Sequence, residues 1–209
     1  NSTAVAERIR RFYGREAIVV PPPVAVDEFQ PAAQRERDHF VWVHRLVPYK
    51  RPLEVAEAFR ELPDLRLTMV GIGPLAGELR ANLPSNVTLH GWLERDELAS
   101  LLASAGGFIH VGEEDFGISM VEALASGAPV VALRRGGALD IVRDGVDGVL
   151  IDPPATPQAI RQAVRAVVGR EWDPASLRRR AEEFSADRFR ARLREVIASR
   201  LKPARGGAG

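Results

Sequence analysis

Residues 106–126 read GGFIHVGEEDFGISMVEALAS, and this stretch decides what kind of fold to expect. Residues 106–111 are small or apolar apart from His110 and predict a strand, whereas residues 119–126 predict a helix. Glu114 falls on the loop between them, and Glu122 falls about one turn into the helix. The stretch therefore predicts a strand–loop–helix unit that places two carboxylates near the start of one helix.

These residue types suit a particular class of ligand. Carboxylates only accept hydrogen bonds, and a pair of them can bind neighbouring hydroxyl groups. The backbone amides of Gly117, Ile118 and Ser119 stand at the predicted helix start, where they suit a phosphate or a sugar oxygen. A site with two carboxylates and an anion-binding helix start favours a nucleotide sugar.

The same alternation of strand and helix continues along most of the chain. Strands are predicted at 40–44, 65–70, 87–90, 108–111, 130–133 and 148–151. Helices are predicted at 2–13, 53–62, 74–81, 95–104, 119–126, 138–142, 157–168, 174–184 and 186–201. Short apolar strands alternating with helices indicate an α/β fold. We expect a Rossmann-like parallel sheet of about six strands, with helices on both faces.

The bulk composition excludes several classes of protein. The 209 residues are 45% hydrophobic and 27% charged, as in ordinary globular domains. The net charge of +1 gives no reason to expect nucleic-acid binding. There is no cysteine, so disulfides and cysteine-bound metals are excluded. No apolar run is long enough for a transmembrane helix, and no signal peptide is recognisable.

Ligands of open parallel sheets bind at the carboxyl ends of the strands, so the loops there should share one rim. Arg45 and Lys50 follow the first strand of the main domain and are predicted to flank a diphosphate. The other loops expected on this rim are Gly71–Pro74, Gly91–Leu93, Gly112–Gly117 and Arg134–Gly137. Gly136 and Gly137 could offer another set of exposed backbone amides or could form a plain turn, and the sequence favours neither. Arg134 and Arg135 are expected to face solvent.

Other patterns in the sequence give weaker evidence about the ligand. Gly71 and Gly73, with Ala76, match a dinucleotide-binding pattern. They follow the second strand rather than the first, and no acidic residue stands at the expected distance, so NAD is disfavoured. The four histidines show no metal-ligand spacing. Residues 178–180 are three arginines in a row, which we interpret as a solvated helix face.

Four motifs, in this order, resemble the family 4 retaining glycosyltransferases, specifically the nucleotide-sugar half of the GT-B fold. They are RLVPYKRP at 45–52, GIGP at 71–74, VTLHGW at 87–92 and EDFG at 114–117 with Glu122 and Ala123. The PPPV at 21–24, the VDEF at 26–29 and the EDFG form of the motif resemble the mannosyltransferase-like branch. The resemblance extends from Asn1 to about Leu201.

The resemblance implies a role for each site residue. Arg45 and Lys50 would bind the donor's phosphates, and Glu114 would handle the donor sugar; these three are the expected catalytic residues. Glu122 would bind the ribose hydroxyls. Donor contacts are further expected from Phe116, Gly117, Ile118, Ser119, Gly71 and Gly73, with the base near Gly91, Trp92 and Leu93. No cofactor and no metal are expected, because such enzymes usually transfer without one.

The chain departs from the family pattern at three positions. His44 stands where Gly is usual and could crowd the phosphate loop, Asp140 stands where Glu is usual, and Val111 replaces a frequent Pro. None of the three is a principal binding group. Donor binding should therefore survive.

The resemblance also divides the chain. Residues 1–16 would be a remnant helix of an N-terminal acceptor lobe, and 17–38 a linker that includes a strand at 17–20. Residues 39–184 would form the donor-binding domain, 185–201 a helix crossing back to the other lobe, and 202–209 a disordered tail. We therefore interpret the chain as a piece of a longer protein, which by itself should transfer little or nothing.

The expected donor is GDP-mannose, and the expected acceptor is a glycan or a lipid-linked sugar held by the other lobe. UDP-glucose or UDP-N-acetylglucosamine remains an alternative donor. A non-catalytic nucleotide-sugar-binding module, an NAD-dependent oxidoreductase and a GT-B phosphorylase are alternative functions. The expected setting is the cytoplasm, or the inner face of a bacterial membrane with peripheral attachment.

Overall fold

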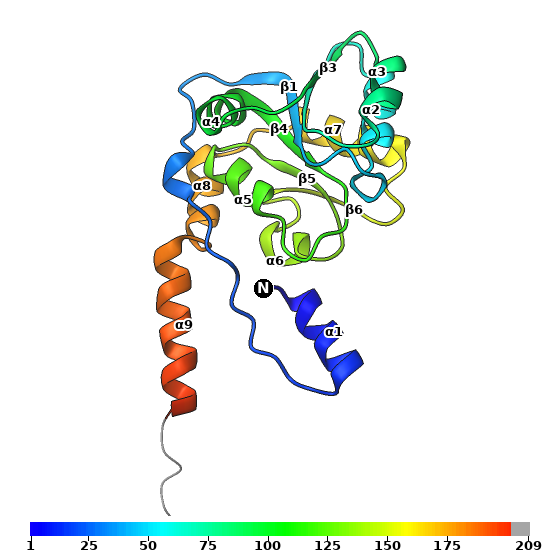
Figure 1. Ribbon diagram of the computed structural model, residues 1–209. Coiled ribbons are helices and arrows are strands. Elements are labelled where there is room, and N and C mark those ends of the chain that lie inside the picture. The colour runs from blue at the N-terminus through cyan, green and yellow to red at the C-terminus, as the bar shows by residue number, and fades with distance from the viewer. Residues whose placement is uncertain (202–209) are drawn as a thin grey trace, which may run out of the picture.

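The computed structural model describes residues 1–201 and contains one parallel sheet of six strands (Figure 1). The strands are β1 (Glu36–Val43), β2 (Arg66–Val70), β3 (Val87–His90), β4 (Ala105–His110), β5 (Val130–Leu133) and β6 (Gly148–Ile151). Their order in the sheet is β3-β2-β1-β4-β5-β6. This confirms the predicted Rossmann-like α/β fold.

The order of the strands reverses between β1 and β4, which lie side by side at the centre of the sheet. Phe40 of β1 pairs with Gly107 of β4, and Val41 pairs with Phe108. Gly107 is needed there, because a Cβ at this position would meet the Phe40 ring at 2.5 Å. A reversal of strand order opens a crevice at the carboxyl ends, which is where ligands of this fold class bind.

Helices cover both faces of the sheet (Figure 1). One face packs against α4 (Arg95–Ser104), α5 (Ile118–Ala125) and α8 (Pro174–Glu182). The other packs against α2 (Pro52–Arg60), α3 (Ala76–Ala81) and α7 (Pro157–Val168). The short α6 (Ala138–Ile141) also packs in the first core. Strands buried on both faces explain why they are continuously apolar rather than alternating.

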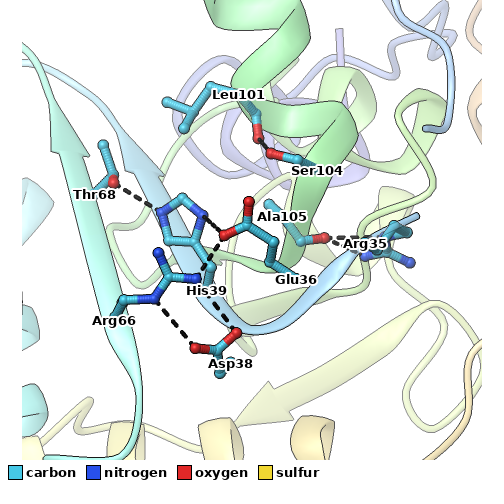
Figure 2. Close-up of polar contacts among 9 residues, drawn as sticks. All are labelled: Arg35, Glu36, Asp38, His39, Arg66, Thr68, Leu101, Ser104 and Ala105. Atoms are coloured by element: carbon cyan, nitrogen blue, oxygen red, sulfur yellow. Dashed lines mark hydrogen bonds and ion pairs between the residues drawn. The ribbon is translucent and has the colours of Figure 1, made fainter. Parts of the chain in front are cut away.

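Polar side chains at the amino end of β1 contact polar side chains of β2 (Figure 2). Arg66 of β2 forms ion pairs with Glu36 and Asp38 of β1. His39 Nε2 lies 2.8 Å from Thr68 Oγ1. These contacts hold the first two strands in register at the edge of the sheet opposite the crevice.

The segments at both ends extend away from the sheet (Figure 1). The helix α1 (Thr3–Tyr13) is capped by the Ser2 side chain, and α9 (Ala186–Leu201) projects from α8. Neither helix contains a buried residue. The predicted disordered tail, 202–209, lies outside the described residues.

The predicted strand at 17–20 is wrong, because residues 14–23 form no regular secondary structure. Three consecutive prolines follow it, and within residues 1–201 no strand of the sheet pairs with this segment. The linker instead contains a 3₁₀ turn, η1 (Val26–Glu28), and joins the main domain where Val24 bridges Ser185.

The interpretation of residues 178–180 as a solvated face is also wrong for two of the three arginines. Arg178 donates to the carbonyls of Phe29 and Ala125, so it fastens the linker to α5. Arg180 donates to the carbonyls of Ile141 and Asp140. Positions two apart do not share a helix face, so the contacts of both arginines come from different neighbouring segments and no spacing rule could predict them.

Candidate active site

An open cleft of about 770 Å³ lies at the carboxyl ends of β1 and β4. It is lined by residues from the loops after both strands and from the start of α5, including Arg45, Lys50, Glu114, Phe116, Gly117, Ile118 and Ser119. These loops are far apart in the sequence, and the predicted rim brings them together. All three residues predicted to be catalytic therefore face one cleft.

Lys50 and Glu114 form an ion pair in this cleft. Lys50 ends a 3₁₀ turn, η2 (Pro48–Lys50), and the left-handed Arg51 (φ 57°) then redirects the chain into α2. Only 4% of the Lys50 side chain is exposed, compared with 27% for Glu114. Burial lowers the pKa of Lys50 to about 8, because the charged ammonium loses solvation.

Glu122 forms a second ion pair with Arg95, whose Nη1 lies 3.1 Å from the Glu122 Oε1. Here the carboxylate is the buried partner, with 9% of its side chain exposed compared with 47% for Arg95. Burial raises the pKa of Glu122, and Arg95 opposes that rise. Arg95 also pairs with Glu28 of η1 and stacks over the Phe29 ring.

Sequence reasoning missed Arg95, which it placed only as the first residue of a helix. The capping box formed by Glu94 and Glu97 confirms that α4 begins there. The contact with Glu122 joins the start of α4 to the middle of α5, across 27 positions of sequence. No spacing rule connects residues so far apart, so only the fold could identify Arg95.

The start of α5 borders the cleft. Gly117 has a left-handed backbone (φ 102°), and no side chain of the described residues caps this helix. Gly117, Ile118 and Ser119 all line the cleft, and Ile118 is 48% exposed; anion binding by their amides stays a prediction. Phe116, by contrast, is buried and packs edge-on against Phe184 at 5.6 Å between ring centroids. Its side chain anchors the loop, which leaves mainly its backbone to face the cleft.

Gly71 and Gly73 have a packing reason that does not depend on a ligand. A Cβ at Gly71 would lie 1.8 Å from the His44 carbonyl oxygen, and one at Gly73 would lie 2.5 Å from that of Leu46. These glycines let the loops after β1 and β2 touch. Their predicted contact with the donor stays a prediction.

The loop predicted to hold the base lies further along the sheet. Gly91, Trp92 and Leu93 follow β3, the edge strand, and none of them lines the cleft around Glu114. Trp92 is 77% exposed, so an aromatic surface is available there. A ligand that contacted both places would have to extend across the ends of β1 and β2.

The turn before α6 packs on the Glu114 loop. The Gly137 amide donates to the Glu114 carbonyl at 2.8 Å, and a Cβ at Gly136 would lie 2.2 Å from the same oxygen. This turn therefore positions the site. Arg134, which was expected to face solvent, is partly exposed and pairs with Asp144 and Asp152 rather than facing the cleft.

His44 and His110 pack edge-to-face beneath the cleft, with 4.5 Å between their ring centroids and 74° between the ring planes. Burial lowers the pKa of His110 to about 3 and that of His44 well below its ordinary value, so both rings are neutral at pH 7. His44 lines the cleft, as expected for a residue that could crowd a phosphate.

The N-terminal segment lies beside the site. The Thr3 amide and hydroxyl both donate to Asp140, and Arg8 pairs with Asp115. A second open cleft, of about 980 Å³, separates α1 from the loops that carry Glu114 and Gly136. Asp140, one of the departures from the family pattern, is thus used to hold α1.

The chain is similar to a known protein family. The family model described as "Glycosyl transferases group 1" matches residues 25–187. A GDP-mannose-dependent alpha-mannosyltransferase of Corynebacterium glutamicum is 41% identical over 90 residues, which cover 43% of this chain and 22% of that protein. A D-inositol 3-phosphate glycosyltransferase of Geodermatophilus obscurus is 32% identical over 90% of this chain and 49% of its own length.

Solved structures show the same fold. A sucrose-phosphate synthase from Thermosynechococcus elongatus superposes with a TM-score of 0.82 at 21% identity, covering 98% of this chain and 58% of that one. The chain spans about half, or less, of the length of the curated relatives described above. Within residues 1–201, no helix combines the length and apolar character needed to cross a membrane.

Proposed function

We propose that this chain, which belongs to the glycosyl transferases group 1 family, is the part of a retaining glycosyltransferase that binds the nucleotide-sugar donor. The donor we propose is GDP-mannose. The acceptor, a glycan or a lipid-linked sugar, would be held by a second lobe. The observation that carries the proposal is the pair of carboxylates near one helix start, each paired with a cation from another element: Lys50 from η2 and Arg95 from the start of α4.

The two pairs suit the two ends of a donor. Lys50 and Arg45 would meet the diphosphate, and the Lys50 ammonium would turn from Glu114 toward it. Glu114 would then accept hydrogen bonds from the sugar hydroxyls. Glu122, buried beside Arg95, would accept bonds from the ribose hydroxyls, while the start of α5 would offer its amides to a phosphate.

The chemistry proposed for Lys50 is stabilisation of the leaving group. As the bond between sugar and diphosphate breaks, negative charge grows on the phosphate oxygens. A cation already in place in a poorly solvated site lowers the barrier because it needs no reorganisation. Lys50 and Arg45 would supply the positive charge that stabilises the phosphate oxygens, so the proposed transfer requires neither a metal nor a cofactor.

The proposed donor rests on the mannosyltransferase-like motifs at 26–29 and 114–117, and on similarity to GDP-mannose-dependent alpha-mannosyltransferases. UDP sugars remain the alternative. A structural neighbour at 21% identity, a pneumococcal O-GlcNAc transferase, was solved with UDP, but so distant a likeness carries the fold alone.

The proposed second lobe would explain two exposed apolar surfaces. On α1, Phe12 and Tyr13 are 69% and 76% exposed, and on α9, Ile197 is 48% exposed. Large apolar side chains gathered on projecting helices favour contact with another part of a protein. We propose that this lobe supplies the acceptor and excludes water, so the chain by itself transfers little. The full protein would work in the cytoplasm or at the inner face of a bacterial membrane.

Calorimetric titration with GDP, UDP, ADP and NADH, then with the matching sugar nucleotides, tests the proposal. Selective binding of GDP and GDP-mannose is expected. Preference for UDP would keep the transferase and replace the donor, whereas NADH binding alone would overturn it in favour of an oxidoreductase. A protein with the second lobe that binds donor but never turns over would instead be a nucleotide-sugar-binding module.

A further inference from the structure

The base of the cleft contains buried polar atoms that the proposed donor chemistry leaves unused. His110 is 1% exposed, and within residues 1–201 neither of its ring nitrogens has a hydrogen-bond partner. The Nε2 of His44, in the neighbouring ring, is buried and unpartnered too. Buried polar groups are nearly always satisfied, and each one that is not costs stability. Three such nitrogens in two rings that pack edge-to-face therefore call for an explanation.

Glu114 completes a cluster with these two rings. His44 directly follows β1, His110 is the last residue of β4, and Glu114 lies on the loop beyond it. One ligand atom from each lies within 4.8 Å of the other two. Two ligands bound tetrahedrally to one ion at about 2.1 Å lie about 3.4 Å apart. The observed distance between His110 Nε2 and Glu114 Oε2 is 3.5 Å.

The free atoms of the cluster come from all three residues. The Nε2 of His44 is buried and has no hydrogen-bond partner within residues 1–201. Lys50 occupies Oε1 of Glu114, so Oε2 is the oxygen turned to His110.

We propose that His44, His110 and Glu114 form a binding site for one divalent transition-metal ion of the zinc class. Two imidazoles and one carboxylate suit zinc, cobalt or nickel, whereas magnesium and calcium prefer oxygen ligands throughout. The ion would engage the carboxylate that the proposed function assigns to the donor sugar. It would therefore compete with the sugar nucleotide rather than assist transfer, which is compatible with transfer that needs no metal.

The test is titration of the whole chain with Zn²⁺ and Co²⁺ without any nucleotide. We expect one ion per chain, visible absorption from bound Co²⁺, and no comparable binding of Mg²⁺. Glu114→Gln keeps the size of the side chain, and His44→Gly removes one ring; each should weaken Zn²⁺ binding at least tenfold. His90→Ala, which removes an exposed histidine outside the cluster, is the matched control and should bind as the parent does.

Two results would overturn the site: no stoichiometric binding by the parent chain, or equal affinity in the parent, Glu114→Gln and His44→Gly. Circular dichroism shows whether each variant is folded. If His44→Gly does not fold, Glu114→Gln still tests the site. Because no nucleotide is present, a failure here leaves the proposed donor function standing. A failure to bind any donor would equally leave the metal site standing.

Discussion

The two ion pairs of the site differ in which partner is buried. In the Lys50–Glu114 pair the cation is buried and the carboxylate is partly exposed, whereas in the Arg95–Glu122 pair the carboxylate is buried and the cation is half-exposed. Burial acts on the buried member in each case. It lowers the pKa of Lys50 to about 8 and raises the pKa of Glu122.

This difference indicates a division of work within the site. A buried lysine that is poorly solvated gains most when a dianionic phosphate approaches it. A buried carboxylate gains most from hydrogen-bond donors such as ribose hydroxyls, which it can bind without a change of partner. The phosphate end would therefore depend on a side chain that moves, and the ribose end on one that is held in place.

The largest expected effect is at the ribose end. Replacing Glu122 with Ala removes a charged acceptor, and we expect nucleotide affinity to fall by about 1.5–3 kcal/mol, roughly 10- to 150-fold. The loss of affinity is measured by calorimetry with the tightest-binding nucleotide. Glu122→Gln, which keeps the size of the side chain and removes its charge, is the control. An unchanged Kd for Glu122→Ala would show that this carboxylate does not bind ribose.

At the phosphate end, Lys50→Ala should separate the two parts of a nucleotide. We expect affinity for the nucleoside diphosphate to fall about tenfold, while affinity for the nucleoside stays unchanged, because only the diphosphate meets the ammonium. The two titrations are compared directly, with Lys202→Ala as a control from the end of the chain. Equal losses for both ligands would refute the phosphate role.

Arg95 should control the pH dependence of binding. Ribose hydroxyls need the ionised Glu122, so affinity is lost as the pH falls through the pKa of that group. Arg95 holds this pKa down, so in Arg95→Ala the pKa rises further and the loss begins at a higher pH. We expect a few-fold weaker binding in mildly acidic buffer, measured as Kd against pH.

The Arg95 effect has a clear control. A double variant, Arg95→Ala with Glu122→Gln, cannot titrate at position 122, so it should show no pH dependence beyond that of Glu122→Gln. A shift that persisted in the double variant would mean that another group is responsible.

The smallest effect on nucleotide affinity is expected from Glu28, the other acidic partner of Arg95. Glu28 contacts Arg95 from the linker, but both side chains are about half-exposed. Exposed ion pairs contribute about 0–1 kcal/mol, at most about fivefold in Kd, and Glu28 reaches Glu122 only through Arg95, so Glu28→Ala should weaken nucleotide binding less than Arg95→Ala does. A loss as large as that of Arg95→Ala would show that the linker is an essential part of the ribose site.

Several local features followed directly from the sequence. The strand–loop–helix unit around Glu114 and Glu122 was predictable, because an apolar run, a glycine turn and a helical stretch each obey short-range rules. The shared rim also followed, since parallel strands carry their loops to one edge. The strand at 17–20 failed, because apolar composition alone ignores whether a neighbouring strand is available for pairing.

What the sequence by itself determined is therefore the order of elements and the loops that carry Arg45, Lys50, Glu114 and Glu122, since these depend on residues close along the chain. Only the tertiary structure decided which partner each group received. Arg95 came to Glu122 and His44 to His110 because the strand order places distant loops side by side. Burial, and with it the charge state of each group, is likewise a property of the whole packing and not of any segment.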